Sequence, residues 1–101
     1  MPLYQLTLFY PKLKEHAGAV QSIRADVESF SGKNWRLLSA GEQVCAIVFE
    51  TDVEHKQLQT RFDTHGSEHF LLFLTEIHSI VSLYLTKDVS KWLSSHLPRN
   101  K

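Results

Sequence analysis

The sequence of 101 residues predicts an α+β domain in which a four-stranded antiparallel sheet carries two helices on one face. Two observations favour this fold. Several short runs have the alternating or continuous apolar pattern of strands, and two longer stretches place apolar residues at helical spacing. These elements follow one another in the order β-α-β-β-α-β, which is the split βαβ, or ferredoxin-like, arrangement. Right-handed crossovers then bring both helices to the same face of the sheet.

The first strand is expected over residues 3–10, and a long helix follows it. The strand alternates so that one face is wholly apolar, formed by Tyr4, Leu6, Leu8 and Tyr10. Pro11 suits the first turn of a helix, because the N–H that it lacks would have no partner there. Apolar residues then recur at helical spacing at Leu13, Ala17, Val20, Ile23, Val27 and Phe30. Gly32 is expected to end this helix, at a position that often needs a positive φ.

Two strands, a second helix and a fourth strand are predicted next. The strands cover 34–41 and 42–50 around a turn near Ala40 and Gly41. The run TDVE at 51–54 is typical of a capping box, in which the Thr51 hydroxyl accepts from the backbone N–H of Glu54. The helix that it starts closes near 64–67, and a strand over 69–77 follows.

The last part of the chain is expected to hold a short terminal helix. Residues 78–85 form a short strand or an irregular connection. Asp88 then caps a helix whose apolar stripe contains Val89, Trp92, Leu93 and His96, and Pro98 stops it. Residues 1–97 are therefore predicted to form one ferredoxin-like domain, with a polar tail over 98–101.

The composition indicates a cytoplasmic protein without a strong electrostatic preference. Lys plus Arg equals Asp plus Glu at 11 each, so net charge does not indicate nucleic acid as a partner, although it leaves this class open. No run approaches the ~20 apolar residues of a membrane span, and no signal-peptide pattern opens the chain. Cys45 is the single cysteine, which excludes an internal disulfide and is typical of a reducing compartment.

The second face of the sheet is predicted to be an interface. Strand 44–50 is apolar on both sides, and so is 70–74, whereas the two helices cover one face only. A homodimer through the open face is the simplest expectation. The predicted interface residues are Cys45, Ile47, Phe49, Leu71, Phe73 and Trp92. The alternative is that the segment 78–97 folds under the sheet and covers this face.

Two patterns in the sequence suggest enzyme-like chemistry, and each also has a structural interpretation. The opening MPLYQL resembles the start of the tautomerase superfamily, in which the proline left after methionine removal is the catalytic base. That resemblance makes Pro2 the base and Arg36 the cation that polarises a carbonyl, whereas the structural interpretation makes Pro2 the start of an edge strand. His65 and His69 have the i, i+4 spacing of helical metal ligands, but Gly66 and Ser67 break the helix between them. No metal site and no cofactor are predicted.

The second half of the chain resembles a known group of proteins. VCAIVFETDVEHKQLQTRFDTHGSEHFLLFLTEI and DVSKWLSSHL are similar to small ferredoxin-like proteins related to VapD and to the CRISPR spacer-acquisition nuclease subunit. Thr51 and Asp52 occupy the place where their third strand ends, and Trp92 and Leu93 match a terminal WL pair. The first strand, LYQLTLFYPKL, resembles that of the antitoxin GhoS. The resemblance implies a bacterial or phage homodimer with nucleic-acid-related chemistry or regulation.

One departure from that group bears on function. Its nuclease members carry an Asp at the end of strand one that holds a divalent metal across the dimer. Residues 3–14 of this chain contain no acid, and Glu15 follows a full turn into the helix. The sequence therefore predicts a homodimeric binding or regulatory protein, antitoxin-like or an accessory subunit, that acts through protein or nucleic-acid binding. The alternative is an enzyme, either tautomerase-like through Pro2 or an atypical RNA nuclease that uses histidines.

Overall fold

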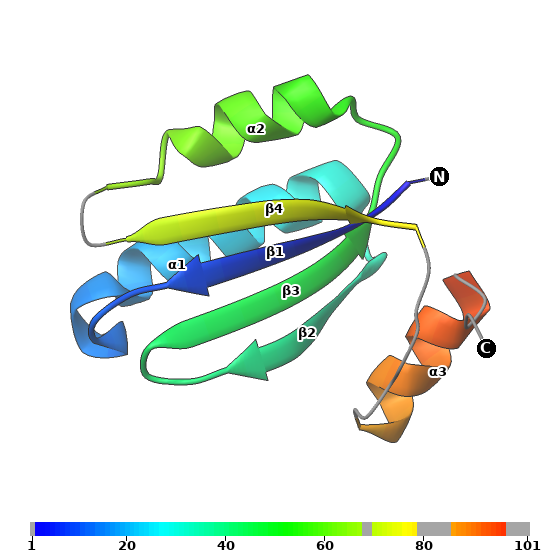
Figure 1. Cartoon of the computed structure of the whole chain (residues 1–101), viewed down its shortest axis with the longest axis horizontal. Helices are drawn as coiled ribbons and strands as arrows, with labels where there is room; N and C mark the ends of the chain where they lie inside the picture. Colours follow the sequence, from blue (N-terminus) through cyan, green and yellow to red (C-terminus); the bar gives the residue numbers. More distant parts are fainter. Residues whose placement is uncertain (1, 68–69, 79–85, 97–101) are drawn as a thin grey trace.

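The computed structural model describes residues 2–67, 70–78 and 86–96 and confirms the ferredoxin-like prediction (Figure 1). Along the chain the elements are β1 (Leu3–Phe9), α1 (Leu13–Ser31), β2 (Trp35–Ala40), β3 (Val44–Glu50), α2 (His55–Asp63), β4 (Leu71–Ile77) and α3 (Lys87–His96). The four strands form one antiparallel sheet in the order β2-β3-β1-β4. Residues 79–85 of the strand or connection predicted over 78–85, His69 and the tail at 98–101 lie outside the described residues. No helix of the described part is both long and apolar enough to cross a membrane.

The central strand β1 sets the register of the sheet. It pairs with β3 from Leu3 opposite Glu50 to Phe9 opposite Val44, and with β4 from Leu3 opposite Ile77 to Phe9 opposite Leu71. Both ladders run without interruption. The pairing of β2 with β3 shifts between Leu37 and Ser39. Because side chains alternate along a strand, this register decides which residues of every strand share a face.

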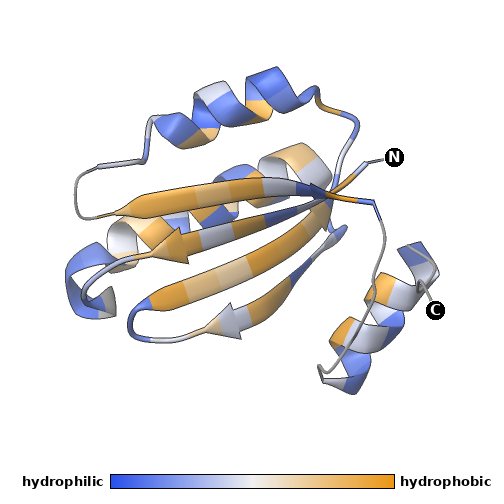
Figure 2. Cartoon of the chain, viewed as in Figure 1, coloured by the Kyte–Doolittle hydropathy of each residue, from blue (hydrophilic) through white to orange (hydrophobic). Residues whose placement is uncertain are grey.

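The main core lies between the sheet and the helices α1 and α2 (Figures 1 and 2). The predicted apolar face of β1 is buried there: Tyr4, Leu6, Leu8 and Tyr10 are each exposed by 4% or less. Ile23 and Val27 of α1 and Leu58 and Phe62 of α2 pack against that face. Phe49 joins the layers, since its ring stacks on Tyr4 and meets the edge of Phe62.

The end of α1 agrees with the sequence. Gly32 has a φ of 65°, and its N–H donates to the carbonyl of Glu28 at 2.7 Å. A left-handed residue at this point costs glycine little, whereas it would strain any residue with a Cβ.

The predicted capping box at Thr51 is wrong. The helix α2 begins at His55, with Glu54 at its N-cap and no side-chain capping bond. The Thr51 hydroxyl instead donates to the carbonyl of Phe30 at 2.7 Å and accepts from the N–H of Val53 at 3.2 Å. Carbonyls in the last turn of a helix lack intrahelical donors, so the buried Thr51 stabilises the end of α1 rather than the start of α2.

The terminal helix α3 covers one end of the second sheet face. For this helical part of the segment 78–97, the alternative prediction that the segment covers the face is therefore confirmed at that end. The stripe of α3 packs on residues of all four strands and forms a second core, made of Leu3, Val48, Val89, Trp92 and Leu93 with Leu38 and Ile77 at its margin. The predicted cap at Asp88 is wrong: the helix starts at Lys87, and the carbonyl of Thr86 accepts from the N–H of Ser90.

Candidate functional site

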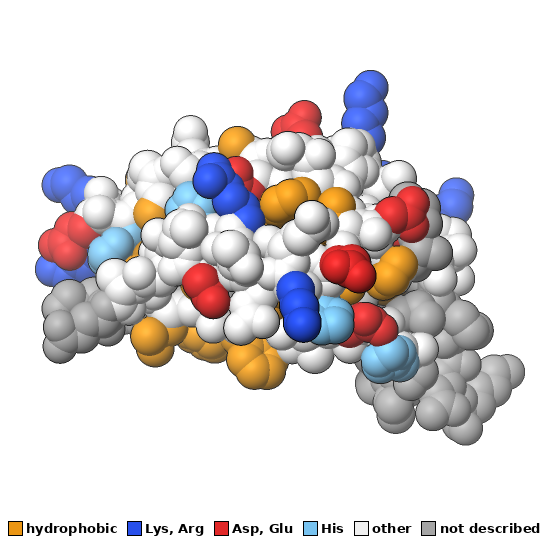
Figure 3. Space-filling view, turned by 90° about the horizontal axis from the view of Figure 1, so that it is seen from above, with side chains coloured by type: hydrophobic (Ala, Val, Ile, Leu, Met, Phe, Trp, Pro, Cys, Tyr) orange, Lys and Arg blue, Asp and Glu red, His pale blue; other side chains and the backbone are white. Residues whose placement is uncertain are grey.

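The other end of the second sheet face stays open to solvent. Phe9, Leu71 and Phe73 are exposed by 48%, 57% and 61%, and they are the large apolar residues that the described structure leaves outside its cores. The register places them together, because Phe9 lies opposite Leu71 and Phe73 lies opposite Thr7. Apolar side chains gather along the lower border of the view in Figure 3, which looks along this face.

This surface, named here the open half-face, is defined by strand pairing. It consists of Thr7, Phe9, Val44, Ala46, Leu71 and Phe73. These positions contain no ionisable side chain, and Thr7 accepts a hydrogen bond from the neighbouring Gln5 amide at 3.2 Å. A small monomer rarely exposes a contiguous apolar patch that serves no contact, so the open half-face is a candidate interaction surface.

The structure corrects four of the six residues of the predicted interface. Cys45, Ile47 and Phe49 point toward the helices and are exposed by 2% or less, so they belong to the main core and do not reach the open face. Burial raises the pKa of the Cys45 thiol against a smaller opposing effect of Arg24, as expected for a packed cysteine. Only Leu71 and Phe73 of the predicted set lie on the open half-face.

Trp92, the sixth predicted interface residue, is buried between α3 and the sheet. It is exposed by 8%, and its ring stacks on His96 with 4.1 Å between centroids. The Arg36 guanidinium lies 5.6 Å from the Trp92 ring centroid and 3.4 Å from the Asp88 carboxylate. These contacts fix α3 on the sheet of the same chain.

The structure does not bring the two residues of the tautomerase-like alternative together. Arg36 is engaged by α3 as described, and the Arg36 guanidinium also donates to the carbonyl of Trp35 at 2.8 Å. Pro2 precedes β1, which is separated from β2 by the whole of β3. Two strand spacings amount to roughly 10 Å, so Arg36 has no route to a substrate carbonyl at Pro2 without leaving α3.

The end of β1, where the nuclease proteins carry their Asp, is occupied by aromatic residues. Phe9 is on the open half-face, while Tyr10 is buried and donates through its hydroxyl to the carbonyl of Gly41 at 2.8 Å. Among the described residues, no group of three His, Cys, Asp or Glu side chains is placed to hold a metal ion. At this end of the strand, Phe9 therefore belongs to the open half-face and Tyr10 to the main core.

The histidines of the described part of the chain are dispersed. His65 bonds to Asp26, whereas His55 is exposed at the start of α2. His16 lies against the rings of Tyr10 and Phe70. His96 bonds through Nδ1 to the carbonyl of Trp92 at 2.7 Å, and its Nε2 lies 3.6 Å from Glu50.

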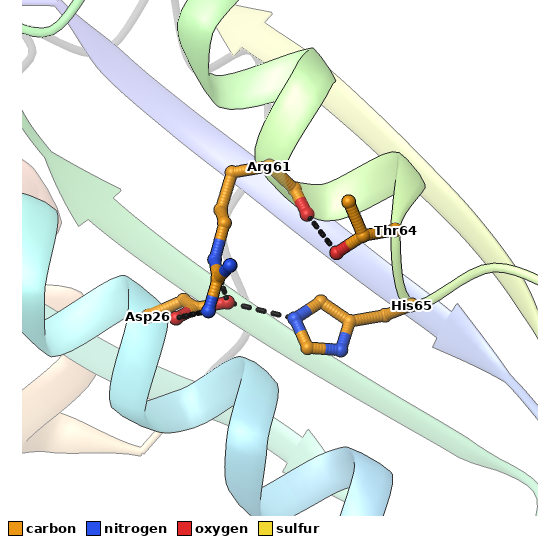
Figure 4. Close-up of polar contacts among 4 residues, drawn as sticks. All are labelled: Asp26, Arg61, Thr64 and His65. Carbon is orange, nitrogen blue, oxygen red and sulfur yellow. Dashed lines mark hydrogen bonds and ion pairs between the residues drawn. The ribbon is translucent and has the colours of Figure 1, made fainter.

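Asp26 ties the two helices together (Figure 4). Its carboxylate accepts from Arg61 through Nε at 2.9 Å and through a terminal nitrogen at 3.1 Å, and it lies 2.7 Å from His65 Nε2. Burial by itself would raise the pKa of Asp26, but the hydrogen bonds and charges of Arg61 and His65 outweigh it and hold the pKa below its usual value. The cluster is a structural clamp between α1 and the end of α2.

We expect Asp26→Asn to lower the free energy of unfolding by about 1 kcal/mol at neutral pH, since a charge-assisted pair is lost. Because the folded pKa of Asp26 is depressed, its contribution is full above the unfolded pKa and disappears as the pH falls through the folded pKa. Urea melts should therefore differ at pH 7 and converge under acid. Asp52→Asn, on an exposed residue, is the matched control. Equal midpoints for Asp26→Asn and wild type at pH 7 would show that the clamp contributes nothing.

A groove between α2 and β4 is a second candidate site, and the sequence did not reveal it. Its volume is about 570 Å³, within the range of ligand sites in proteins. The floor is apolar and is formed by Tyr4, Leu6, Phe62, Leu72 and Leu74. Its polar rim includes His55 and Asp63 from α2 and Glu76 and His78 from the other wall. Burial raises the pKa of the Tyr4 phenol, and the Glu76 carboxylate raises it further by its charge and a hydrogen bond.

Fold and sites together define the class of the protein: a ferredoxin-like α+β domain with an open apolar half-face and a groove at one sheet edge. Comparisons with family models, with curated proteins and with solved structures gave no match.

Proposed function

We propose that the protein is a small homodimeric binding protein, in which two copies join through their open half-faces and present the remaining surface to a partner. The observation that carries this proposal is the exposure of Phe9, Leu71 and Phe73 side by side on the end of the sheet face that α3 leaves uncovered. Burying such side chains stabilises an assembly by roughly 25 cal/mol per Å² of apolar surface removed from water.

A second copy of the chain fits this surface better than a charged partner does. The six positions of the open half-face have no ionisable group, so two copies stack without repulsion between like charges. The chain as a whole has a formal net charge of +0. An interface that meets itself about a two-fold axis must be self-complementary, and an uncharged apolar surface satisfies that condition.

The position of α3 limits how the two copies can meet. The helix stands on the same sheet face at the end that contains Leu3, Val48 and Ile77. The sheet of a second copy therefore has room only over the open half-face. The α3 helix of that second copy would then lie at the end of the interface opposite the first copy's α3. In this arrangement the two α3 helices flank the stacked strands, which enlarges the interface beyond the six strand positions.

The biological role proposed with this dimer is regulatory or accessory, as the resemblance to the VapD-related proteins and to GhoS implies. The end of β1 supports a binding role, since Phe9 and Tyr10 stand where the nuclease members carry their metal-holding Asp. The balanced charge favours a protein partner over nucleic acid, because phosphate-backbone binding depends on excess Lys and Arg.

Leu71→Glu tests the dimer. Sedimentation equilibrium of the wild type at micromolar concentration should give twice the 11.7 kDa chain mass, and Leu71→Glu should give one chain mass. The variant should keep its fold, because Leu71 is 57% exposed and two introduced carboxylates would face each other only in the dimer. Gln57→Glu, which adds the same charge on the exposed side of α2, should remain dimeric. A wild type of one chain mass, or a Leu71→Glu variant that dimerises equally well, would overturn the proposal.

A further inference from the structure

Within the described part of the chain, the strand β4 has an unpaired edge next to the α2–β4 groove. In the order β2-β3-β1-β4 it is a terminal strand, and its partner is β1 alone. Alternate residues of an antiparallel edge strand point their N–H and C=O groups away from the sheet. Among the described residues, no backbone hydrogen bond joins β4 to an element other than β1. This edge can accept a further strand.

The edge of β4 lacks the usual features that prevent strand addition. Its seven residues, LLFLTEI, contain no proline and no lysine, and its pairing with β1 has no bulge. Glu76 is its single charged residue. The helix α2 stands beyond the edge rather than over it (Figure 1), so the α2–β4 groove runs beside the free backbone groups.

The groove selects for apolar and cationic side chains. Leu72 and Leu74 of β4 contribute to its apolar floor, and Glu76 follows them on the same face of the strand. Asp63 and Glu76 line it, whereas no Lys or Arg among the described residues does. Because α2 and β4 run in opposite directions, these two acids lie toward opposite ends of the groove (Figure 1). The exposed His78, whose Nε2 lies 3.1 Å from the Glu76 carboxylate, would have to share or give up that contact when a ligand cation binds.

We propose that the α2–β4 groove binds an extended segment of a protein partner, which adds to the sheet as a strand antiparallel to β4. Its backbone pairs with the free edge, two alternate apolar side chains lie over Leu72 and Leu74, and a Lys or Arg side chain pairs with Glu76. Addition of a strand to a sheet edge is an established mode of peptide recognition, with backbone bonds giving affinity and alternate side chains giving specificity. In antiparallel pairing, the ligand residue opposite Glu76 precedes, in the ligand sequence, the residues opposite Leu74 and Leu72. This order predicts the ligand pattern basic-x-apolar-x-apolar.

The inference names the partner class of the proposed binding function and rests on it, but the two sites lie mainly on opposite faces of β4, with Phe73 bordering both. The groove belongs to the face of β4 that holds Leu72, Leu74 and Glu76, and the open half-face to the opposite one that holds Leu71 and Phe73. The Leu71→Glu variant should therefore bind the ligand segment as the wild type does. A dimer that binds no segment refutes this inference alone, whereas a monomer that binds one refutes the dimer alone.

The test uses labelled peptides of the sequence Thr-Arg-Thr-Val-Ser-Val-Thr, titrated by fluorescence anisotropy into the full chain. We expect saturable binding that weakens about three-fold when Arg is replaced by Gln in the peptide, or when Glu76→Gln is made in the protein. Binding of the Gln peptide to the Glu76→Gln protein should be no weaker than binding with either change alone. Glu42→Gln, in the turn between β2 and β3, is the matched control and should bind as the wild type does.

Backbone pairing is tested with two N-methylated forms of the same peptide. Methylation of one alternate set of amides removes the donors that face β4 and should abolish binding, whereas methylation of the other set should leave most of it. Equal loss in both forms, equal affinity of the Arg and Gln peptides, or no saturable binding of the parent peptide would overturn the proposal.

Discussion

Replacing Trp92 by alanine is expected to lower the free energy of unfolding by about 3–5 kcal/mol, a large share of the ~5–15 kcal/mol that keeps a domain folded. The ring is 8% exposed and packs in the second core with Leu3, Val48 and Leu93. Its truncation also removes the stacking partner of His96 and the surface over which the Arg36 guanidinium lies. Urea unfolding followed by far-ultraviolet circular dichroism measures the change.

The physical reason is that α3 cannot persist alone. Ten residues are too few for a stable isolated helix in water, so the order of α3 depends on packing its stripe on the sheet. Lys91→Ala, at an exposed position of the same helix, should change the midpoint little. If Trp92→Ala and wild type unfolded at equal urea concentrations, the helix would be a detachable arm rather than part of the fold.

Phe49→Ala is expected to have a comparable effect, about 3–5 kcal/mol of unfolding free energy, from the other side of the sheet. Phe49 is 0% exposed and contacts the rings of Tyr4 and Phe62 at centroid distances of 5.7 Å and 6.2 Å. The cavity left by the ring would lie between the sheet and α2, where the surrounding helices can close it only in part.

The matched control is Phe73→Ala, the same truncation on the open half-face. Both variants are made in the Leu71→Glu background, so that dimer formation does not contribute to the melts. Phe73 is 61% exposed, and its loss should change the unfolding free energy by less than about 1 kcal/mol. A larger loss for Phe73→Ala than for Phe49→Ala would mean that the two faces of the sheet have been assigned the wrong way round.

The comparison of Phe49 with Tyr4 shows what the sequence could and could not reveal about the sheet. In β1 the apolar residues alternate with Gln5 and Thr7, so the alternation alone distinguishes the buried face from the mixed one. In β3 both sets of alternate residues are apolar, and no pattern distinguishes the face of Phe49 from that of Val48. The pairing of Phe49 with Tyr4 decides the matter, and that pairing depends on the folded register.

Polar residues were harder to place because their partners are distant in sequence. The Thr51 hydroxyl suits a helix cap, but it donates its hydrogen bond to the carbonyl of Phe30, 21 residues away. Asp26 and His65 are 39 residues apart and form no sequence motif. Gly32, by contrast, acts through its own backbone, and its role at the end of α1 was predictable for that reason.

The groove could not be predicted because it depends on where α2 lies, not on which residues form it. Leu58 and Phe62 have the spacing of an amphipathic helix, and they are buried as that spacing indicates. The position of α2 depends on contacts between residues distant in sequence, such as those of Phe62 with Phe30 and Phe49. Periodicity indicates which side of a helix is buried. The position of the helix relative to the sheet depends instead on the side chains that pack between them.

The most direct measurement of the proposed dimer is hydroxyl-radical footprinting of the wild-type chain across a dilution series, read by mass spectrometry. If two copies join through the open half-face, labelling of Phe9, Leu71 and Phe73 should fall steeply as the concentration rises through the dissociation constant. Labelling of His55, which is exposed on α2, should stay constant and serves as the internal control. Labelling of Phe9, Leu71 and Phe73 that is high and independent of concentration would contradict the homodimer.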